Sequence, residues 1–261
     1  MARKAGPAIH LQKMISEFRN AGIPTVFWNK EDPPNFDYFI ETAKLFDHVF
    51  TTASEAVSQY ERHGAVNKVE VLPFFYQPKL HHPPLRFPRV HGAHFAGTYL
   101  ENKHADRRVW MDVLLEPAVS YGLDIFARRK NRYPYRWPTN LRDNVRQALP
   151  YRQLVVAQAL YAVALNVNTV SNSSSMCSRR LFELVASGVP TLSTPSPAIG
   201  VFFGDAVHET RSQQEARDTL QSLLSTSRAN RVWEPPTHYL EKHSARARVE
   251  QLLAATKLTS G

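Results

Sequence analysis

Arg179, Arg180 and Glu183 lie close together in the segment 165–195, LNVNTVSNSSSMCSRRLFELVASGVPTLSTP. Glu183 follows Arg179 by four residues and Arg180 by three, so a helix would place all three side chains on one side. Two cations beside a carboxylate can serve a binding site for a charged ligand. They can equally form a solvent-exposed helix ion pair, which contributes about 0.3–0.5 kcal/mol. The spacing by itself leaves both interpretations open.

A strand, a loop, a helix and a second strand are expected to position these three side chains. The apolar run 162–167 predicts a strand whose end is marked by Asn166 and Asn168, and the Ser/Asn cluster 171–175 is rich in helix-capping residues. Apolar residues recur at helical spacing between 177 and 185, and Gly188 and Pro190 end that helix before a strand at 189–193. This is a unit of an open α/β sheet, in which ligands bind outside the carboxyl ends of the strands.

The remaining elements alternate between strands and helices. The pattern predicts, in chain order, a helix 9–20, strand 23–28, helix 36–45, strand 47–51, helix 54–62, strand 69–72, strand 94–96, helix 107–120, strand 123–127, helix 150–161, a short strand from 202–203 and 207–208, helix 212–224 and a closing helix 239–258. Such alternation favours parallel sheets with helices on their faces.

The segment 165–188 resembles the donor-binding motif of the GT-B glycosyltransferases, in particular of the CgeB-like (spore-maturation-protein-like) group. There an LN strand leads through a Ser-containing loop into an R-x-F-E helix and a small residue before Gly. Here these are 165–166, 180–183 and 187–188. The resemblance implies that Glu183 binds the nucleotide ribose and that Arg180 supplies positive charge at the diphosphate. The first glutamate of the wider E-x7-E motif falls at Ser175, which leaves the sugar contact and the stereochemical outcome open.

Further positions resemble the same group and complete the set of expected donor contacts. The strand ending in Gly97-Thr98 resembles an F-x-G-[ST] motif, where a residue without Cβ lets the backbone approach a diphosphate, although a plain turn would use the same glycine. Arg128 stands where the group usually has glycine, and a phosphate contact is expected there. Asn168 completes the expected nucleotide-binding residues. His243, in a stretch that resembles a closing H-T-x-x-x-R helix, is expected either near the donor or on a surface helix.

The amino-terminal half carries a weaker resemblance. Trp28, Asp32 and Pro33, followed by the V-F-T strand 49–51, match the order W…D-P, V-F-T of the group. Asp32 could contact an acceptor or could simply form a turn before two prolines. The chain opens on a helix with the early strands of this domain missing. We therefore expect a fragment, a misassigned start or a naturally shortened protein, with an unpaired sheet edge that self-associates or is covered by a partner.

We accordingly expect an α/β, GT-B-like fold with two Rossmann-type domains, of which the amino-terminal one is truncated. The predicted boundaries are 1–78 for the partial acceptor-side domain, 79–88 for a proline-rich linker and 89–261 for the donor domain with its carboxyl-terminal helix. Two histidine pairs flank the linker, His81-His82 and His91 with His94. They could bind a metal, but no carboxylate or cysteine stands at ligand spacing.

Composition and charge narrow the class of partner. The chain of 261 residues has a formal net charge of +9, which calls for an anionic partner such as a nucleotide diphosphate, an anionic polymer, an acidic membrane surface or nucleic acid. Basic residues are interleaved with aromatics in 128–137, a pattern that can bind single-stranded nucleic acid, yet the sequence contains no recognisable nucleic-acid-binding module and we do not expect such binding. There is no signal-peptide core and no apolar run of about 20 residues, so a cytoplasmic protein without a membrane span is expected. The single cysteine, Cys177, is expected as a buried core thiol.

The resemblance implies a metal-independent glycosyltransferase that needs no cofactor. Its donor would be a nucleotide sugar, with UDP favoured, and its acceptor, whether a glycan, a protein or a small molecule, is not identified by the sequence. No catalytic base can be named. Two alternatives stay open: a GT-B-shaped sugar-nucleotide epimerase that needs no acceptor, and a non-catalytic relative that binds a nucleotide sugar or a protein partner.

Overall fold

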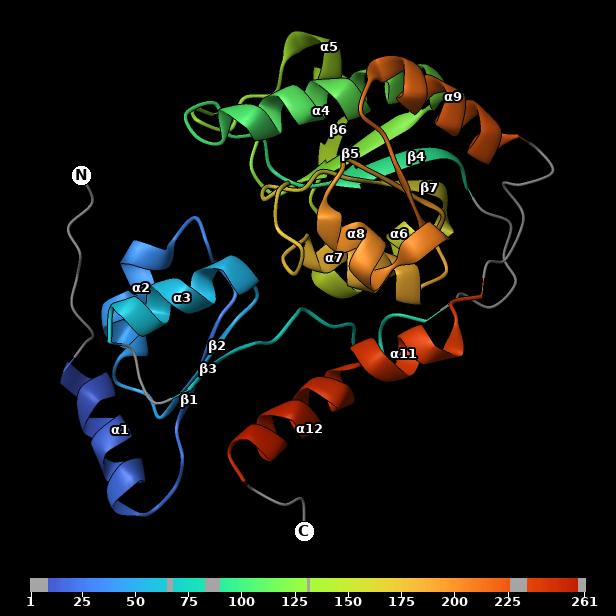
Figure 1. Ribbon diagram of the computed structural model, residues 1–261. Helices are drawn as coiled ribbons and strands as arrows, with labels where there is room; N and C mark the ends of the chain where they lie inside the picture. The colour runs from blue at the N-terminus through green and yellow to red at the C-terminus, as the bar shows by residue number, and fades with distance from the viewer. Residues whose placement is uncertain (1–8, 65–67, 83–89, 131, 226–233, 258–261) are drawn as a thin grey trace. The chain divides into compact units, whose positions relative to one another are not determined.

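The computed structural model describes residues 9–64, 68–82, 90–130, 132–225 and 234–257 (Figure 1). The chain forms two compact units. The first contains Met1–Phe74, Ser173–Met176 and Ala245–Gly261, and the second contains Phe75–Asn172 and Cys177–Ser244. The second unit therefore ends before the predicted 89–261 domain does, because the last helix belongs to the first unit. The linker prediction 79–88 falls largely on residues 83–89, which lie outside the described part of the chain.

The first unit is built on a parallel sheet of three strands in the order β1-β2-β3. Its elements are α1 (Ile9–Asn20), β1 (Val26–Asn29), α2 (Phe36–Ala43), β2 (His48–Thr51), α3 (Ser54–Arg62) and β3 (Val69–Val71). Val49 on β2 packs with Phe36 and Ile40 of α2 and with Ala56 and Tyr60 of α3. The predicted succession of strands and helices is confirmed here.

The Ser/Asn cluster 171–175, which precedes the helix predicted over 177–185, contacts the start of a different helix, α3. Ser175 Oγ accepts a hydrogen bond from the main-chain N–H of Ser54 at 2.7 Å, and Ser173 Oγ donates to the Glu55 carboxylate at 2.9 Å. Both contacts lie at the start of α3, where main-chain N–H groups have no partner within the helix. The residue at the position of the missing glutamate, Ser175, therefore has a structural role in the first unit.

The predicted closing helix 239–258 is two helices, α11 (Thr237–His243) and α12 (Ala245–Ala255). Ser244 separates them with extended backbone angles. In the first unit, Arg248 of α12 is 2% exposed and donates to the main-chain oxygens of Pro73 at 2.9 Å and Phe74 at 3.1 Å. These charge-assisted bonds hold α12 to the end of the segment that follows β3.

The second unit is a six-stranded parallel sheet in the order β6-β5-β4-β7-β8-β9. Its strands are β4 (Val90–Ala96), β5 (Leu123–Ala127), β6 (Val145–Gln147), β7 (Tyr161–Asn166), β8 (Thr191–Ser193) and β9 (Val207–Glu209). One face is covered by α4 (Ala105–Ala118), α5 (Thr139–Arg142) and α9 (Gln213–Leu224), and the other by α6 (Tyr151–Leu160), α7 (Arg179–Ala186) and α8 (Pro197–Phe202) (Figure 1). The short elements α5, β6 and α8 were not predicted, and Phe202 and Phe203, expected in a strand, instead form the end of α8.

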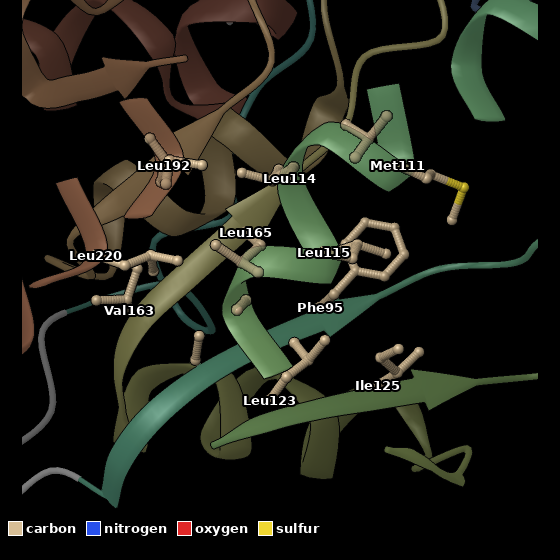
Figure 2. Close-up of a cluster of buried hydrophobic side chains, with 14 of the residues drawn as sticks. Phe95, Met111, Leu114, Leu115, Leu123, Ile125, Val163, Leu165, Leu192 and Leu220 are labelled. Atoms are coloured by element: carbon tan, nitrogen blue, oxygen red, sulfur yellow. The ribbon is translucent and has the colours of Figure 1, made fainter. Parts of the chain in front are cut away.

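The core of the second unit lies between the sheet and the α4–α9 layer. Figure 2 shows Phe95 and Leu165 of the central strands facing Leu115 of α4, with Leu220 of α9 at the far side. All four side chains are fully buried. This packing fixes β4 and β7 side by side. The strand order runs outward in opposite directions from that pair, which opens a crevice at their carboxyl ends. No helix among the described residues is long and apolar enough to cross a membrane.

His94 lies in the centre of β4 and is fully buried. It lies beside Asp124 and Ala164 in the register of the sheet, and its ring meets Tyr161 edge to face, with centroids 5.1 Å apart. Neither ring nitrogen has a hydrogen-bond partner among the described residues. Burial, with a smaller effect from the charge of Arg180, lowers the pKa of His94 to about 3. The ring is therefore neutral in the folded protein at pH 7.

We predict that His94 makes the second unit sensitive to acid. An unfolded histidine binds a proton from about pH 6.5 downward, whereas the folded ring does so only near its pKa of about 3. Within this window each unit of pH lost lowers the free energy of unfolding by up to about 1.4 kcal/mol. His94→Phe keeps a flat ring and removes this contribution. Urea unfolding between pH 7.5 and 5 should show a shallower loss for the variant than for the wild type. Equal slopes for His94→Phe and the wild type would contradict the prediction.

Candidate functional site

A cavity of about 480 Å³ opens beyond the carboxyl ends of β4, β5 and β6 in the second unit. Helix α6 and the first turns of α7 form its other wall. The lining residues are Ala96, Gly97, Thr98, Phe126, Arg128, Ala148, Leu149, Pro150, Tyr151, Leu154, Gln158, Arg179, Arg180 and Glu183. Five of the residues proposed from the sequence as nucleotide contacts thus line one cavity: Gly97, Thr98, Arg128, Arg180 and Glu183.

Gly97 lines the cavity, and no larger residue fits at this position. A Cβ at this position would lie 2.6 Å from two ring atoms of Phe95, and Phe95 is fully buried in the core and has no room to move away. The next residue, Thr98, is held by Arg107, whose Nη1 donates to the Thr98 main-chain oxygen at 3.0 Å. The packing of Phe95 therefore requires a glycine at position 97, and Arg107 holds the main chain at position 98.

Arg180 is the most buried of the three arginines that line the cavity. It is half-buried, and its guanidinium lies 5.9 Å from the centre of the Phe95 ring. Among the described residues nothing accepts a hydrogen bond from its side chain. Burial, followed by the like charges of Arg107, Arg179 and Arg128, lowers its pKa to about 10 against the opposing effect of Glu183. The guanidinium stays charged at neutral pH, and this desolvated charge favours the binding of an anion.

Glu183 has its two carboxylate oxygens in different environments. The residue is 7% exposed. Its Oε1 lies 3.0 Å from Arg179 Nε and accepts a hydrogen bond from the Tyr151 hydroxyl at 2.9 Å. Oε2 makes no hydrogen bond with the described residues. The ion pair considered from the sequence thus forms with Arg179, while Arg180 stays unpaired and one carboxylate oxygen is free to accept from a ligand.

Three residues that we did not assign to the site from the sequence support this carboxylate. Tyr151 contacts Glu183 directly, His81 Nε2 lies 3.0 Å from the Tyr151 hydroxyl, and the main-chain N–H of Gln77 donates to His81 Nδ1 at 3.0 Å. In the sequence analysis His81 was considered only as a metal ligand. No local pattern signals its role, because His81 and Tyr151 meet Glu183 only through the fold. Within the described ranges no group of three or more His, Cys, Asp and Glu side chains could hold a metal ion.

Asn168, proposed as a nucleotide contact, does not line the cavity. It is 1% exposed, and its Oδ1 accepts the main-chain N–H of Ser178 at 3.0 Å while its Nδ2 donates to the Thr194 oxygen at 2.9 Å. These bonds tie the residue after β7 to the end of β8 and to the start of α7. Asn168 therefore fixes the place where α7 begins and so positions Arg180 and Glu183.

Asp32 and His243 lie elsewhere. Asp32 of the first unit is fully buried and accepts hydrogen bonds from Asn29, Thr51 and Tyr60 at 2.6–2.9 Å, which fits the turn-forming role rather than an acceptor contact. His243 is 3% exposed and packs against the rings of Phe182, Phe202 and Tyr239, away from the residues that line the cavity. Cys177 is buried, and burial raises the pKa of its thiol, so the expected buried core thiol is confirmed.

Comparison with known proteins adds the family. Residues 105–254, more than half of the chain, match the family model described as "Glycosyl transferase-like". These residues include α4, most strands of the second unit and Arg128, Arg180 and Glu183 at the cavity. No curated protein matches the chain.

Several solved structures share the fold at low sequence identity. Sucrose-phosphate synthase from Thermosynechococcus elongatus has a TM-score of 0.58 and 11% identity over 94% of this chain and 70% of its own. The α,α-trehalose 6-phosphate synthase from Burkholderia multivorans has a TM-score of 0.55 and 13% identity over 95% and 70%. TarM from S. aureus, in complex with Fondaparinux, alpha-GlcNAc-glycerol and UDP, has a TM-score of 0.54 and 14% identity over 86% and 46%.

At such identities the likeness establishes the fold alone, which is the α/β, GT-B-like fold expected from the sequence. The family match spans Arg128, Arg180 and Glu183 of the cavity and five of the six strands of the second unit. The chain therefore belongs to the glycosyl transferase-like family and has a GT-B-like α/β fold.

Proposed function

We propose that the chain transfers a sugar from a nucleotide-activated donor to an acceptor, that a UDP-sugar is the donor, and that no bound metal takes part. The observation that carries this proposal is the arrangement in one cavity of a guanidinium and a carboxylate oxygen that make no hydrogen bond with the described residues. A diphosphate joined to a ribose offers the complementary groups in the same order, first anionic oxygens and then a pair of hydroxyl donors.

The diphosphate is proposed to lie between the main chain at Gly97-Thr98 and the start of α7. Arg180 stands in the first turn of α7, where the helix dipole also favours negative charge. Arg128 on the opposite wall is exposed and adds a second cation. In sugar transfer the diphosphate is the leaving group, and fixed cations that meet its growing charge lower the barrier without a metal ion.

The ribose is proposed to lie against Glu183. Its Oε2 can accept hydrogen bonds from both vicinal hydroxyls, because an ionised carboxylate oxygen has two acceptor positions. UDP is the first nucleotide to test, since it was bound in TarM, one of the structures with the same fold. Membership of the CgeB-like subgroup, proposed from the R-x-F-E helix, goes with this donor assignment. The acceptor and the catalytic base are not assigned.

The first test is a thermal-shift panel of UDP, GDP, ADP and the corresponding nucleotide sugars. A ligand at a hundred times its dissociation constant adds about 2.7 kcal/mol to the free energy of unfolding, so binding should raise the melting temperature visibly. We expect UDP and UDP-sugars to give the largest shift, with no change when EDTA is added. Conversion of a UDP-sugar without any acceptor would favour an epimerase. A panel without any shift would contradict the proposal.

Arg180→Gln tests the diphosphate assignment. Loss of charge-assisted hydrogen bonds worth about 1.5–3 kcal/mol should weaken UDP binding about tenfold to a hundredfold and leave uridine binding unchanged. Arg128→Ala should show the same selectivity with a smaller loss, because its side chain is more exposed. Arg246→Gln changes the net charge equally at an exposed position of α12 and serves as the calorimetric control. Equal losses for UDP and uridine would place the arginines away from the phosphates.

Glu183→Gln tests the ribose assignment. The variant keeps the shape and removes the charge, so UDP binding should weaken about tenfold to a hundredfold. Wild type should lose most of its affinity for 2′,3′-dideoxy-UDP, whereas the variant should barely distinguish it from UDP. If calorimetry shows the same discrimination in both proteins, Glu183 serves only as the ion-pair partner of Arg179.

A further inference from the structure

A chain of hydrogen bonds runs from the main chain of Gln77 to the carboxylate of Glu183. Its links are Gln77 N–H to His81 Nδ1 at 3.0 Å, His81 Nε2 to the Tyr151 hydroxyl at 3.0 Å, and that hydroxyl to Glu183 Oε1 at 2.9 Å. His81 is 3% exposed, so water does not compete for its ring nitrogens. All four residues belong to the second unit.

The direction of each bond follows from its first donor. A main-chain N–H can only donate, so His81 Nδ1 is an acceptor and the proton of the neutral ring sits on Nε2. Burial lowers the pKa of His81, which keeps the ring neutral at pH 7. His81 Nε2 therefore donates to the Tyr151 oxygen, and the Tyr151 hydroxyl in turn donates a hydrogen bond to Glu183 Oε1. Burial and the charge of Glu183 raise the pKa of Tyr151 to about 12, so the phenol keeps its proton.

This chain of hydrogen bonds occupies Oε1 of the Glu183 carboxylate and does not involve Oε2. Oε1 accepts a hydrogen bond from the Tyr151 hydroxyl at 2.9 Å and lies 3.0 Å from Arg179 Nε in an ion pair. A carboxylate held at one oxygen by a hydrogen bond from α6 and an ion pair on α7 cannot turn about its last bond without losing both contacts. Oε2, which has no partner among the described residues, is thereby fixed in the wall of the cavity with both acceptor positions open.

We propose that Tyr151 and His81 are positioning residues that hold Glu183 Oε2 in place to read a vicinal diol. The inference rests on the proposed function, because the diol is the ribose of the nucleotide donor. The specificity for that diol then depends on hydrogen bonds behind Glu183, which are made by side chains that do not themselves bond to the diol. The ring of Tyr151 also lines the cavity and is 44% exposed, so its hydroxyl and its ring have separable roles.

The test compares Tyr151→Phe with a matched control, Tyr161→Phe. Tyr151→Phe keeps the ring and removes only the donor to Glu183. Tyr161 also donates to a carboxylate, that of Asp124 at 2.5 Å, but does not line the cavity. Calorimetry measures the ratio of affinities for UDP and 2′,3′-dideoxy-UDP. We expect the wild-type ratio of about tenfold or more to fall to about threefold or less in Tyr151→Phe and to persist in Tyr161→Phe.

His81→Leu breaks the chain one step earlier and guards against a folding defect in the first variant. It should lower the same ratio by a smaller factor, about threefold, because Tyr151 still donates but is no longer held. Melting temperatures of both variants establish that they are folded. A parallel loss of affinity for both nucleotides in Tyr151→Phe would mean a general effect on the cavity and would overturn the inference.

The outcomes also separate this inference from the proposed function. If the wild type, Tyr151→Phe and His81→Leu all discriminate between the two nucleotides equally well, the positioning role alone is overturned. A wild type that binds both nucleotides with equal affinity would overturn the ribose assignment of Glu183 and this inference with it.

Discussion

The site depends on one constraint of the parallel sheet, the reversal of strand order between β4 and β7. Strands added on either side of this pair carry their connections away from each other, so the loops at the carboxyl ends diverge and leave a crevice. The cavity uses the loops after β4, β5 and β6 for one wall and α7, which follows β7, for the other. Phe95 and Leu165 hold the two central strands together from beneath.

Among the described residues, the charged side chains of the cavity do not all have a partner of opposite charge. Arg179 is paired with Glu183, whereas Arg180 lies against the Phe95 ring with no acceptor within the described residues. A desolvated guanidinium costs free energy in the empty protein, and an anionic ligand offsets that cost when it binds. The arrangement therefore sacrifices some stability for anion affinity. Functional sites are where residues that lower the stability of the folded protein are expected.

Polar residues below the cavity divide into two kinds. Asn168 is fully used, since it links the residue after β7 to the end of β8 and to the start of α7. The hydrogen bonds of its amide fix the position of the start of α7. His94, one strand away, has neither nitrogen paired among the described residues and is kept neutral by burial. The first stabilises the geometry of the site, and the second makes the unit less stable in acid.

The sequence by itself determined the regular elements and the spacing on α7. Helices such as 54–62 and strands such as 123–127 could be predicted residue by residue, because periodicity and end signals are local properties. The grouping of Arg180 and Glu183 on one helix was equally local, and the resemblance of that helix to a donor motif gave the correct fold. Shorter elements such as α5 and β6 were missed, since their few residues show neither a helical period nor an apolar run.

Tertiary structure decided which of these residues act together. It paired Glu183 with Arg179 rather than Arg180, and it brought His81 to Tyr151 across 70 residues of sequence. It also buried Asp32 and His243 and directed Ser175 to the start of α3. A hydrogen bond between distant segments depends on where packing places each backbone, and no local pattern encodes that placement. The physical reason is that burial and partner choice are properties of the whole core, whereas propensity and spacing belong to a few consecutive residues.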